Sequence, residues 1–285
     1  MQIKRREFFG TALAAGMSVV AADRLAAQDD APARGGRGAA PTPTYPAKVE
    51  KLFKSPDRYP NALEAMPDGL WVGDQVSERV LKMDWKTGKV LEDFIAEAHN
   101  TSGLAVGGGF LWIGCNGSGT AASTRPFNRP FDKSFGEIAK CDMKTGKQVW
   151  GFKTPWGGQH GTTYDRATDK LWAVAPGLGL AVELDPKDNL RILRMIQIGG
   201  GTPHGIEIYD GAIWILAAAD RTVRKHDMSG RVQEIWTLGP SDPDPHGLCI
   251  HDGYAYSCDA GLGGGRAPSA GTVPQLIFRF PITKV

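Results

Sequence analysis

The chain has 285 residues, of which 41% are hydrophobic and 22% are charged, and its formal net charge is +2. This composition suits a folded protein with a substantial core, and the charge gives no sign of the basic surface that nucleic-acid binding requires. The 37 glycines and 19 prolines follow no Gly-X-Y period, which excludes collagen and favours a turn-rich fold. The 4 cysteines are too few for a disulfide scaffold.

The first 27 residues have the pattern of a secretory signal peptide. Arg5 and Arg6 precede a mostly apolar run over residues 8–22, and the small-residue cleavage site Leu25-Ala26-Ala27 follows. The run is too short to span a membrane, and the arginine pair before Glu-Phe-Phe is similar to a twin-arginine signal. We therefore expect a periplasmic or secreted protein with no stable membrane span after cleavage. The alternative is a basic N-terminus ahead of a buried helix.

Residues 28–47 are expected to form a disordered linker. They are rich in Ala, Pro, Gly and Arg and have no apolar period. The folded domain is then expected to comprise residues 48–285.

A repeat organises this domain. Its clearest part is an apolar segment centred on an aromatic residue, found at residues 70–73, 111–114, 171–174, 213–216 and 255–258. The repeats begin at Asn61, Ser102, His160, His204 and His246, at intervals of 41, 58, 44 and 42 residues. The long interval contains an insertion. Four short strands per repeat at this period predict the blades of a β-propeller, and the repeated aromatic residue is expected to pack between blades.

The last repeat lacks a fourth strand before the chain ends. Residues 49–53 resemble the fourth strands at residues 90–94 and 232–236. We therefore predict an all-β, five-bladed propeller in which this N-terminal strand completes the C-terminal blade and closes the ring. Closure would remove exposed sheet edges.

Three repeat starts are a histidine followed by glycine. Equivalent positions in a ring point toward a common axis, so His160, His204 and His246 are expected to converge at one mouth of the central channel. Neutral imidazole is the commonest protein ligand for metals, which suggests a divalent metal ion held by these residues, with His99 as a further ligand. The alternative is that the three histidines are structural residues of the repeat.

Other side chains are candidates for contacts with a substrate. Asn61 occupies the equivalent position in the first repeat. Arg125 and Arg129 belong to the insertion, and Arg266 belongs to a long loop of the fifth repeat. Arginine suits paired hydrogen bonds to a carboxylate or a similar anion.

Two acids follow repeat starts by three positions. Glu64 and Glu207 lie on strands that should line the channel, so each is a candidate proton carrier. If side chains alternate strictly along the strand, Glu64 and Glu207 point to the opposite face from the repeat starts. They could therefore point into the interface between blades instead.

Two motifs resemble known propeller families. The Pro-His-Gly phrases at residues 203–205 and 245–247, each followed by a turn and an aromatic strand, resemble the repeats of virginiamycin B lyase-type propellers. The Asp-x-x-Thr-Gly-Lys turns at residues 84–89 and 142–147 resemble those of glutamine cyclotransferase and YVTN-type propellers. The first resemblance implies that His204 and His246 act with a divalent cation to break a carbon–oxygen bond. The second implies acyl transfer.

The sequence thus predicts an exported, metal-dependent propeller enzyme, expected to be a monomer. Lyase chemistry on a small oxygen-containing substrate is the favoured activity, with His204, His246 and Glu207 as catalytic residues. A non-catalytic propeller that binds a ligand or protein is the alternative, and a glutamine cyclotransferase-like acyl transfer is the third possibility.

Overall fold

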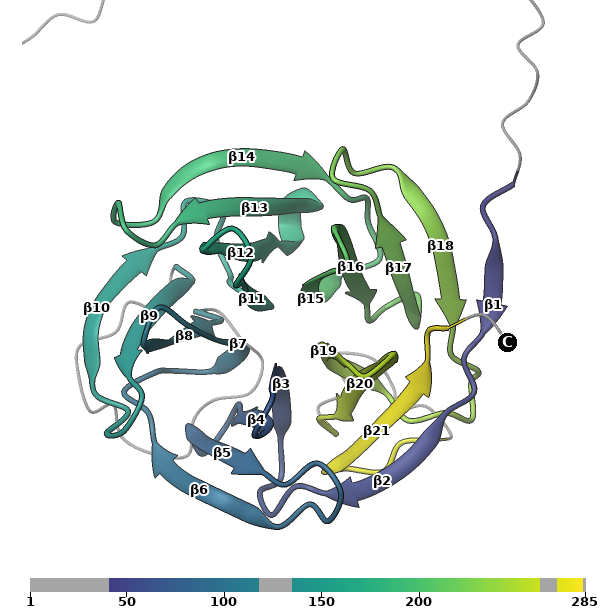
Figure 1. Cartoon of the computed structure of the whole chain (residues 1–285), viewed down its shortest axis with the longest axis horizontal. Coiled ribbons are helices and arrows are strands. Elements are labelled where there is room, and N and C mark those ends of the chain that lie inside the picture. The colour runs from purple at the N-terminus through teal and green to yellow at the C-terminus, as the bar shows by residue number, and fades with distance from the viewer. Residues whose placement is uncertain (1–40, 118–134, 262–270, 284–285) are drawn as a thin grey trace, which may run out of the picture. The chain divides into compact units, whose positions relative to one another are not determined.

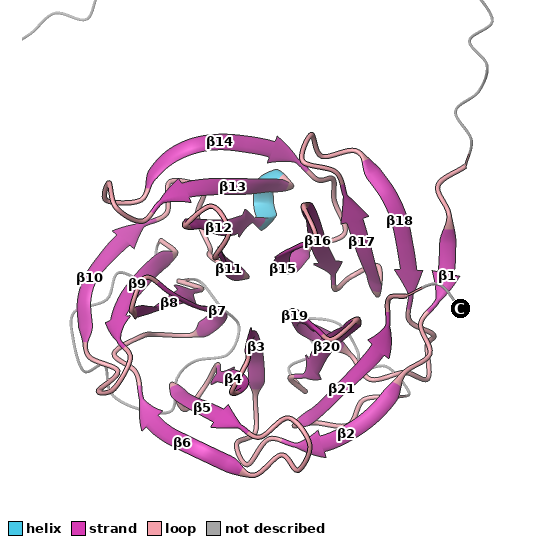
Figure 2. Cartoon of the chain, in the orientation of Figure 1, coloured by secondary structure: helices cyan, strands magenta, loops and turns pink. Residues whose placement is uncertain are grey.

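The computed structural model describes residues 41–117, 135–261 and 271–283. These residues form five β-sheets arranged as blades around a central axis (Figure 1). Strands, turns and loops account for all of them except a short 3-10 helix at Pro176–Leu178 (Figure 2). The described part of the chain contains no helix that is long and apolar enough to cross a membrane. The predicted all-β, five-bladed propeller is confirmed.

The strands follow the repeat from the innermost strand to the rim. Blade one contains β3 (Pro60–Met66), β4 (Gly69–Asp74), β5 (Arg79–Met83) and β6 (Val90–Ile95). Blade two contains β7 (Thr101–Gly107), β8 (Phe110–Cys115), β9 (Glu137–Asp142) and β10 (Gln148–Lys153). Blade three contains β11 (Thr162–Asp165), β12 (Lys170–Ala175), β13 (Leu180–Asp185) and β14 (Arg191–Gln197). Blade four contains β15 (Pro203–Tyr209), β16 (Ala212–Ala217), β17 (Thr222–His226) and β18 (Val232–Thr237).

Blade five joins strands from both ends of the folded chain. It contains β19 (Pro245–His251), β20 (Tyr254–Asp259) and β21 (Leu276–Pro281), and β2 (Glu50–Lys54) is its outer strand. β2 runs antiparallel to β21, with Glu50 opposite Arg279. This is the pairing that the incomplete last repeat predicts.

The linker expectation is wrong for its last residues. β1 (Thr44–Pro46) pairs in parallel with β18 and adds a fifth strand to blade four. The ring centroids of Tyr45 and Trp236 lie 5.6 Å apart. The edge of β18 and the ring of Trp236 thus give this short segment a partner that its composition does not reveal. The remaining linker residues up to 40 and the expected signal peptide lie outside the described residues.

The repeated aromatic residue packs between blades, as predicted. The five members are Trp71, Trp112, Trp172, Trp214 and Tyr256, and each belongs to a core cluster shared with the following blade. Tyr256 of blade five packs with Leu63 and Val72 of blade one, so the series of interfaces is continuous around the ring.

The glycine after four of the five repeat starts allows the inner strands to approach one another. A Cβ on Gly103 would lie 2.3 Å from the carbonyl oxygen of His160, and one on Gly161 would lie 2.6 Å from that of His204. A Cβ on Gly247 would lie 2.9 Å from the backbone nitrogen of Leu63. Any side chain here would push neighbouring blades apart, so glycine sets the diameter of the channel.

Candidate functional site

The five repeat starts meet at one end of the central channel, which we call the channel mouth (Asn61, Ser102, His160, His204 and His246). Asn61 Nδ2 donates to Ser102 Oγ over 3.2 Å, and Ser102 Oγ lies 3.3 Å from His160 Nδ1. The ring centroids of His160 and His204 are 4.4 Å apart, and those of His204 and His246 are 4.8 Å apart. The interplanar angles of 82° and 79° make each pair edge-to-face. The structure therefore brings the three imidazoles and Asn61 together in one cluster.

A β-bulge aims the side chains of the repeat starts. The pairing register of the innermost strands shifts at this position in four blades, between Pro60 and Ala62, Thr101 and Gly103, Pro203 and Gly205, and Pro245 and Leu248. A bulge inserts one unpaired residue and so changes the phase of alternation. A repeat start and the residue three positions later can therefore both face the channel.

His160 is hydrogen-bonded through both of its ring nitrogens. Its Nε2 lies 3.1 Å from Asn116 Nδ2, and its Nδ1 faces Ser102. Burial lowers the pKa of His160 to about 4, and the nearby His246 contributes further. The ring is therefore neutral at pH 7. Asn116 follows the end of β8 directly, and the sequence alone gave no reason to select it.

The segment that leads into His246 is held by buried polar contacts. Asp259 Oδ2 accepts a hydrogen bond from the Asp244 backbone N–H over 3.1 Å, and Arg221 forms a 3.2 Å ion pair with the Asp244 carboxylate. The second guanidinium nitrogen of Arg221 donates to three backbone carbonyls, those of residues 239, 242 and 243. These contacts fix the approach of His246 to the channel.

Glu64 and Glu207 lie deeper in the same channel. Arg166 of blade three donates a short hydrogen bond to Glu64 of blade one, and these blades are not neighbours, so the contact crosses the axis. Glu207 Oε1 accepts from Thr163 Oγ1 over 2.9 Å. Burial raises the pKa of both carboxyls, that of Glu207 to about 7. The bulge explains why the acids line the channel although strict alternation allowed the other orientation.

The remaining candidate residues are placed differently. His99 is buried beside blade one, with its Nδ1 3.8 Å from Glu78 Oε1, whereas the other three imidazoles pack on one another. Arg125, Arg129 and Arg266 lie outside the described residues. Within the described ranges, no three His, Cys, Asp or Glu side chains are already positioned to hold a metal ion together.

Comparisons with known proteins show the fold. No family model and no curated protein sequence matches the chain. The Myxococcus xanthus glutaminyl cyclase superposes with a TM-score of 0.59 at 10% identity, over 84% of this chain and 97% of that one. A luciferin-regenerating enzyme superposes with a TM-score of 0.53 at 13% identity, over 82% and 95% of the two chains. The Staphylococcus aureus virginiamycin B lyase superposes with a TM-score of 0.45 at 14% identity, over 81% and 69%. At these identities the superpositions show the propeller architecture alone, which the chain also shares with the WD40 repeats of RRP9.

Proposed function

We propose that the protein is an exported enzyme that acts on a small oxygen-containing substrate at the channel mouth, with a divalent metal ion held by His160, His204 and His246. The observation that carries the proposal is the packing of three imidazoles from three different blades at one point. Breakage of a carbon–oxygen bond, a lyase reaction, is the chemistry we assign to it.

The type of ligand at the mouth suits a divalent metal, because three imidazoles supply ring nitrogens. Metal ligation requires neutral imidazole, and a pKa of about 4 keeps His160 in that form at neutral pH. Nδ1 of His160 is hydrogen-bonded to Ser102, and Nε2 is hydrogen-bonded to Asn116. Binding a metal therefore exchanges one of these contacts for a ligand bond. When bound, the metal supplies a Lewis acid that polarises a substrate oxygen.

Side chains around the mouth supply orientation and proton transfer. The Asn61 amide and the Ser102 hydroxyl offer hydrogen bonds to a substrate beside the imidazoles. A carbon–oxygen lyase takes a proton from carbon and returns one to the leaving oxygen. Glu207, with a pKa of about 7, can accept and donate a proton near neutral pH. Glu207 and His204 both belong to β15. We assign it the role of proton carrier.

Metal analysis of the purified full chain tests the proposal. We expect about one zinc or similar divalent ion per chain after dialysis against the metal, and its loss in the double variant His160→Ala/His204→Ala. His251→Ala is the matched control, because this half-buried imidazole stacks on Trp85 at the opposite end of the inner strand. A wild-type chain that takes up no metal, or a double variant that keeps it, would overturn the metal assignment.

A non-catalytic binding propeller is the second candidate. It is favoured by the hydrogen bonds that already engage both nitrogens of His160. A metal-free chain that binds a ligand at the mouth without converting it would support this candidate. Release of ammonia from a glutaminyl dipeptide would instead support acyl transfer.

A further inference from the structure

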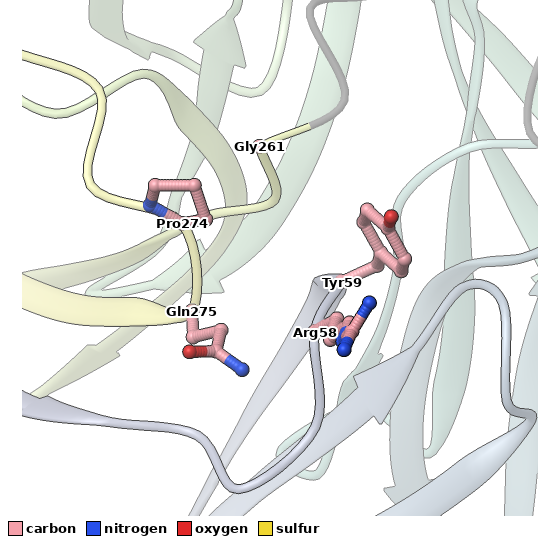
Figure 3. Close-up of a pocket in the computed structure, with 5 residues that line it drawn as sticks. All are labelled: Arg58, Tyr59, Gly261, Pro274 and Gln275. Carbon is pink, nitrogen blue, oxygen red and sulfur yellow. The ribbon is translucent and has the colours of Figure 1, made fainter.

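A pocket of about 310 Å³ opens on the same face as the channel mouth. It is lined by Arg58, Tyr59, Gly261, Pro274 and Gln275. Figure 3 shows Arg58 and Tyr59 facing Pro274 and Gln275 across the opening. The first pair precedes β3 of blade one, and the second pair precedes β21 of blade five. The pocket therefore lies at the junction between these two blades.

The pocket is close to the histidine cluster. Asn61 lies three positions after Arg58 in the chain, so their Cα atoms are at most about 11 Å apart. Asn61 donates to Ser102 in the mouth, and the strand start at Gly247, next to His246, packs against Ala62. The pocket therefore adjoins the start of the strand that carries Asn61 into the channel mouth.

Arg58 differs from the other arginines of the described chain. All of the others form an ion pair with a carboxylate, namely Arg79, Arg166, Arg191, Arg194, Arg221, Arg224, Arg231 and Arg279. Within the described ranges, the guanidinium of Arg58 has no ion pair and no hydrogen bond, although Asp57 is its neighbour in sequence. An arginine that lines a pocket and is not paired with a carboxylate can donate hydrogen bonds to a bound anion.

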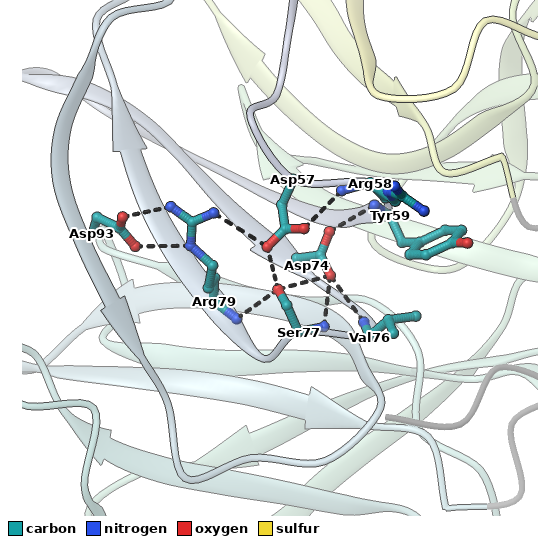
Figure 4. A network of polar contacts seen from close by, with 8 residues as sticks. All are labelled: Asp57, Arg58, Tyr59, Asp74, Val76, Ser77, Arg79 and Asp93. Atoms are coloured by element: carbon teal, nitrogen blue, oxygen red, sulfur yellow. Dashed lines mark hydrogen bonds and ion pairs between the residues drawn. The ribbon is translucent and has the colours of Figure 1, made fainter. Parts of the chain in front are cut away.

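A polar network explains why Asp57 does not neutralise Arg58. The Asp57 carboxylate accepts hydrogen bonds from Ser77 Oγ, from Arg79 Nη1 and from the backbone N–H of Arg58. Arg79 is shared between Asp57 and Asp93, and the side chain of Arg58 extends away from this group (Figure 4). The network thus directs the guanidinium of Arg58 toward the pocket.

Both walls of the pocket are fixed by backbone contacts. Asp74 Oδ2 accepts a hydrogen bond from the Tyr59 backbone N–H over 2.6 Å. Gln275 has a φ of 74°, which is uncommon for a residue with a side chain. Its N–H donates to Asp259 O over 3.0 Å, and its C=O accepts from Ser55 N over 2.8 Å. The structure thus maintains an unfavourable backbone conformation that places an amide side chain opposite the arginine, as is common at functional sites.

We propose that this pocket binds the carboxylate of the substrate, with Arg58 as the anion-binding residue and Gln275 as a second hydrogen-bond donor. The substrate is then a small organic acid whose acid group lies in the pocket while its reacting oxygen lies at the imidazoles. The statement that the bound acid is the substrate rests on the proposed function. Binding of a carboxylate to the pocket needs no metal.

Benzoate and its neutral isostere benzamide are suitable probes. We titrate each into the ¹⁵N-labelled full chain, which has been stripped of metal with EDTA and then dialysed free of the chelator, and follow amide shifts of the pocket residues. We expect saturable binding of benzoate, no binding of benzamide, and at least a tenfold weaker benzoate affinity in Arg58→Gln. Arg58→Lys should bind with intermediate affinity, because it retains the charge but loses the paired geometry.

Arg231→Gln is the matched control, since Arg231 is an exposed arginine paired with Asp227 in a distant turn. Its benzoate affinity should equal that of the wild type. The proposal is overturned if Arg58→Gln, shown to be folded by an unchanged unfolding temperature, binds benzoate normally. It is also overturned if benzamide binds as well as benzoate, or if inorganic phosphate binds more tightly than benzoate. Benzoate binding that persists in metal-free His160→Ala/His204→Ala would support the pocket independently of the metal.

Discussion

Burial shifts two channel residues toward their neutral forms. It raises the pKa of Glu207 from its ordinary 4.5 to about 7 and lowers that of His160 from 6.5 to about 4. Between the ordinary and the shifted pKa, folded Glu207 holds a proton that the unfolded chain releases, so its contribution to stability falls as the pH rises. Folded His160 lacks a proton that the unfolded chain binds, so its contribution is lost as the pH falls.

Glu207→Gln should remove the penalty for ionising this buried carboxyl. We expect the variant to exceed the wild type in free energy of unfolding at pH 8, by on the order of 3 kcal/mol, because the shift spans between two and three pKa units. The difference should shrink toward zero at pH 4.5, where the carboxyl is mostly protonated in the folded chain. Urea denaturation at both pH values measures it.

Glu92→Gln, the same exchange at an exposed strand position, serves as the control for the substitution itself. If the stability difference between Glu207→Gln and the wild type is the same at both pH values, folding leaves the pKa of this carboxyl near its ordinary value, which would contradict the raised pKa.

His160 should titrate at a pH far below the ordinary range of solvent-accessible histidines. We expect its ring ¹⁵N shifts to remain those of neutral imidazole down to pH 5, with a midpoint near 4. In His246→Ala, the midpoint should move upward, because one positive neighbour is removed. A midpoint above 6 in the wild type would contradict the buried, neutral imidazole on which metal ligation depends.

At the scale of strands, the repeat start combines a bulge with a glycine in blades two, four and five. The bulge turns a polar side chain into the channel, and the glycine lets the next blade pack against the same strand. The sequence showed the His-Gly pairs and their common repeat position. It did not show the bulge, because a bulge is a relation between two strands, and so the orientation of Glu207 stayed open until the register was known.

Gly103→Ala should be strongly destabilising. The new Cβ would lie 2.3 Å from the His160 carbonyl oxygen and 2.7 Å from the Thr162 backbone nitrogen, so a neighbouring blade must move. We expect a loss of at least about 2–3 kcal/mol, as for severe overpacking. Gly177→Ala is the matched control, because no atom lies within 4 Å of its added Cβ. Chemical denaturation of both variants measures the difference, and equal stabilities would disprove the close approach of the blades.

At the scale of the whole molecule, strands from the start of the domain stabilise its end. β2 completes blade five, and β1 covers the rim of blade four. The ring of inter-blade clusters is then continuous, with Tyr256 joining the last blade to the first. Deleting either strand exposes a sheet edge, but only β2 is needed for a four-stranded blade.

Two truncations distinguish these roles. Removal of residues up to 47 should lower the unfolding temperature by a few degrees, because β1 pairs over only three residues. Removal up to 54 should lower it much more and promote association, because the edge of β21 becomes available to another chain. Thermal unfolding and size-exclusion chromatography report both effects. A protein that lacks β2 yet remains monomeric and equally stable would contradict closure by this strand.

The sequence by itself determined the architecture, because a propeller is built from local strand periods, turns and a repeated aromatic residue that recur along the chain. It also identified His160, His204 and His246, because equivalent positions of a closed ring must converge. Only the tertiary structure decided the contacts between residues from different blades. These include Asn116 beside His160, Glu64 paired with Arg166 across the axis, and the pocket that joins Arg58 to Gln275. Such contacts depend on register, bulges and loop paths, which no period in the sequence encodes.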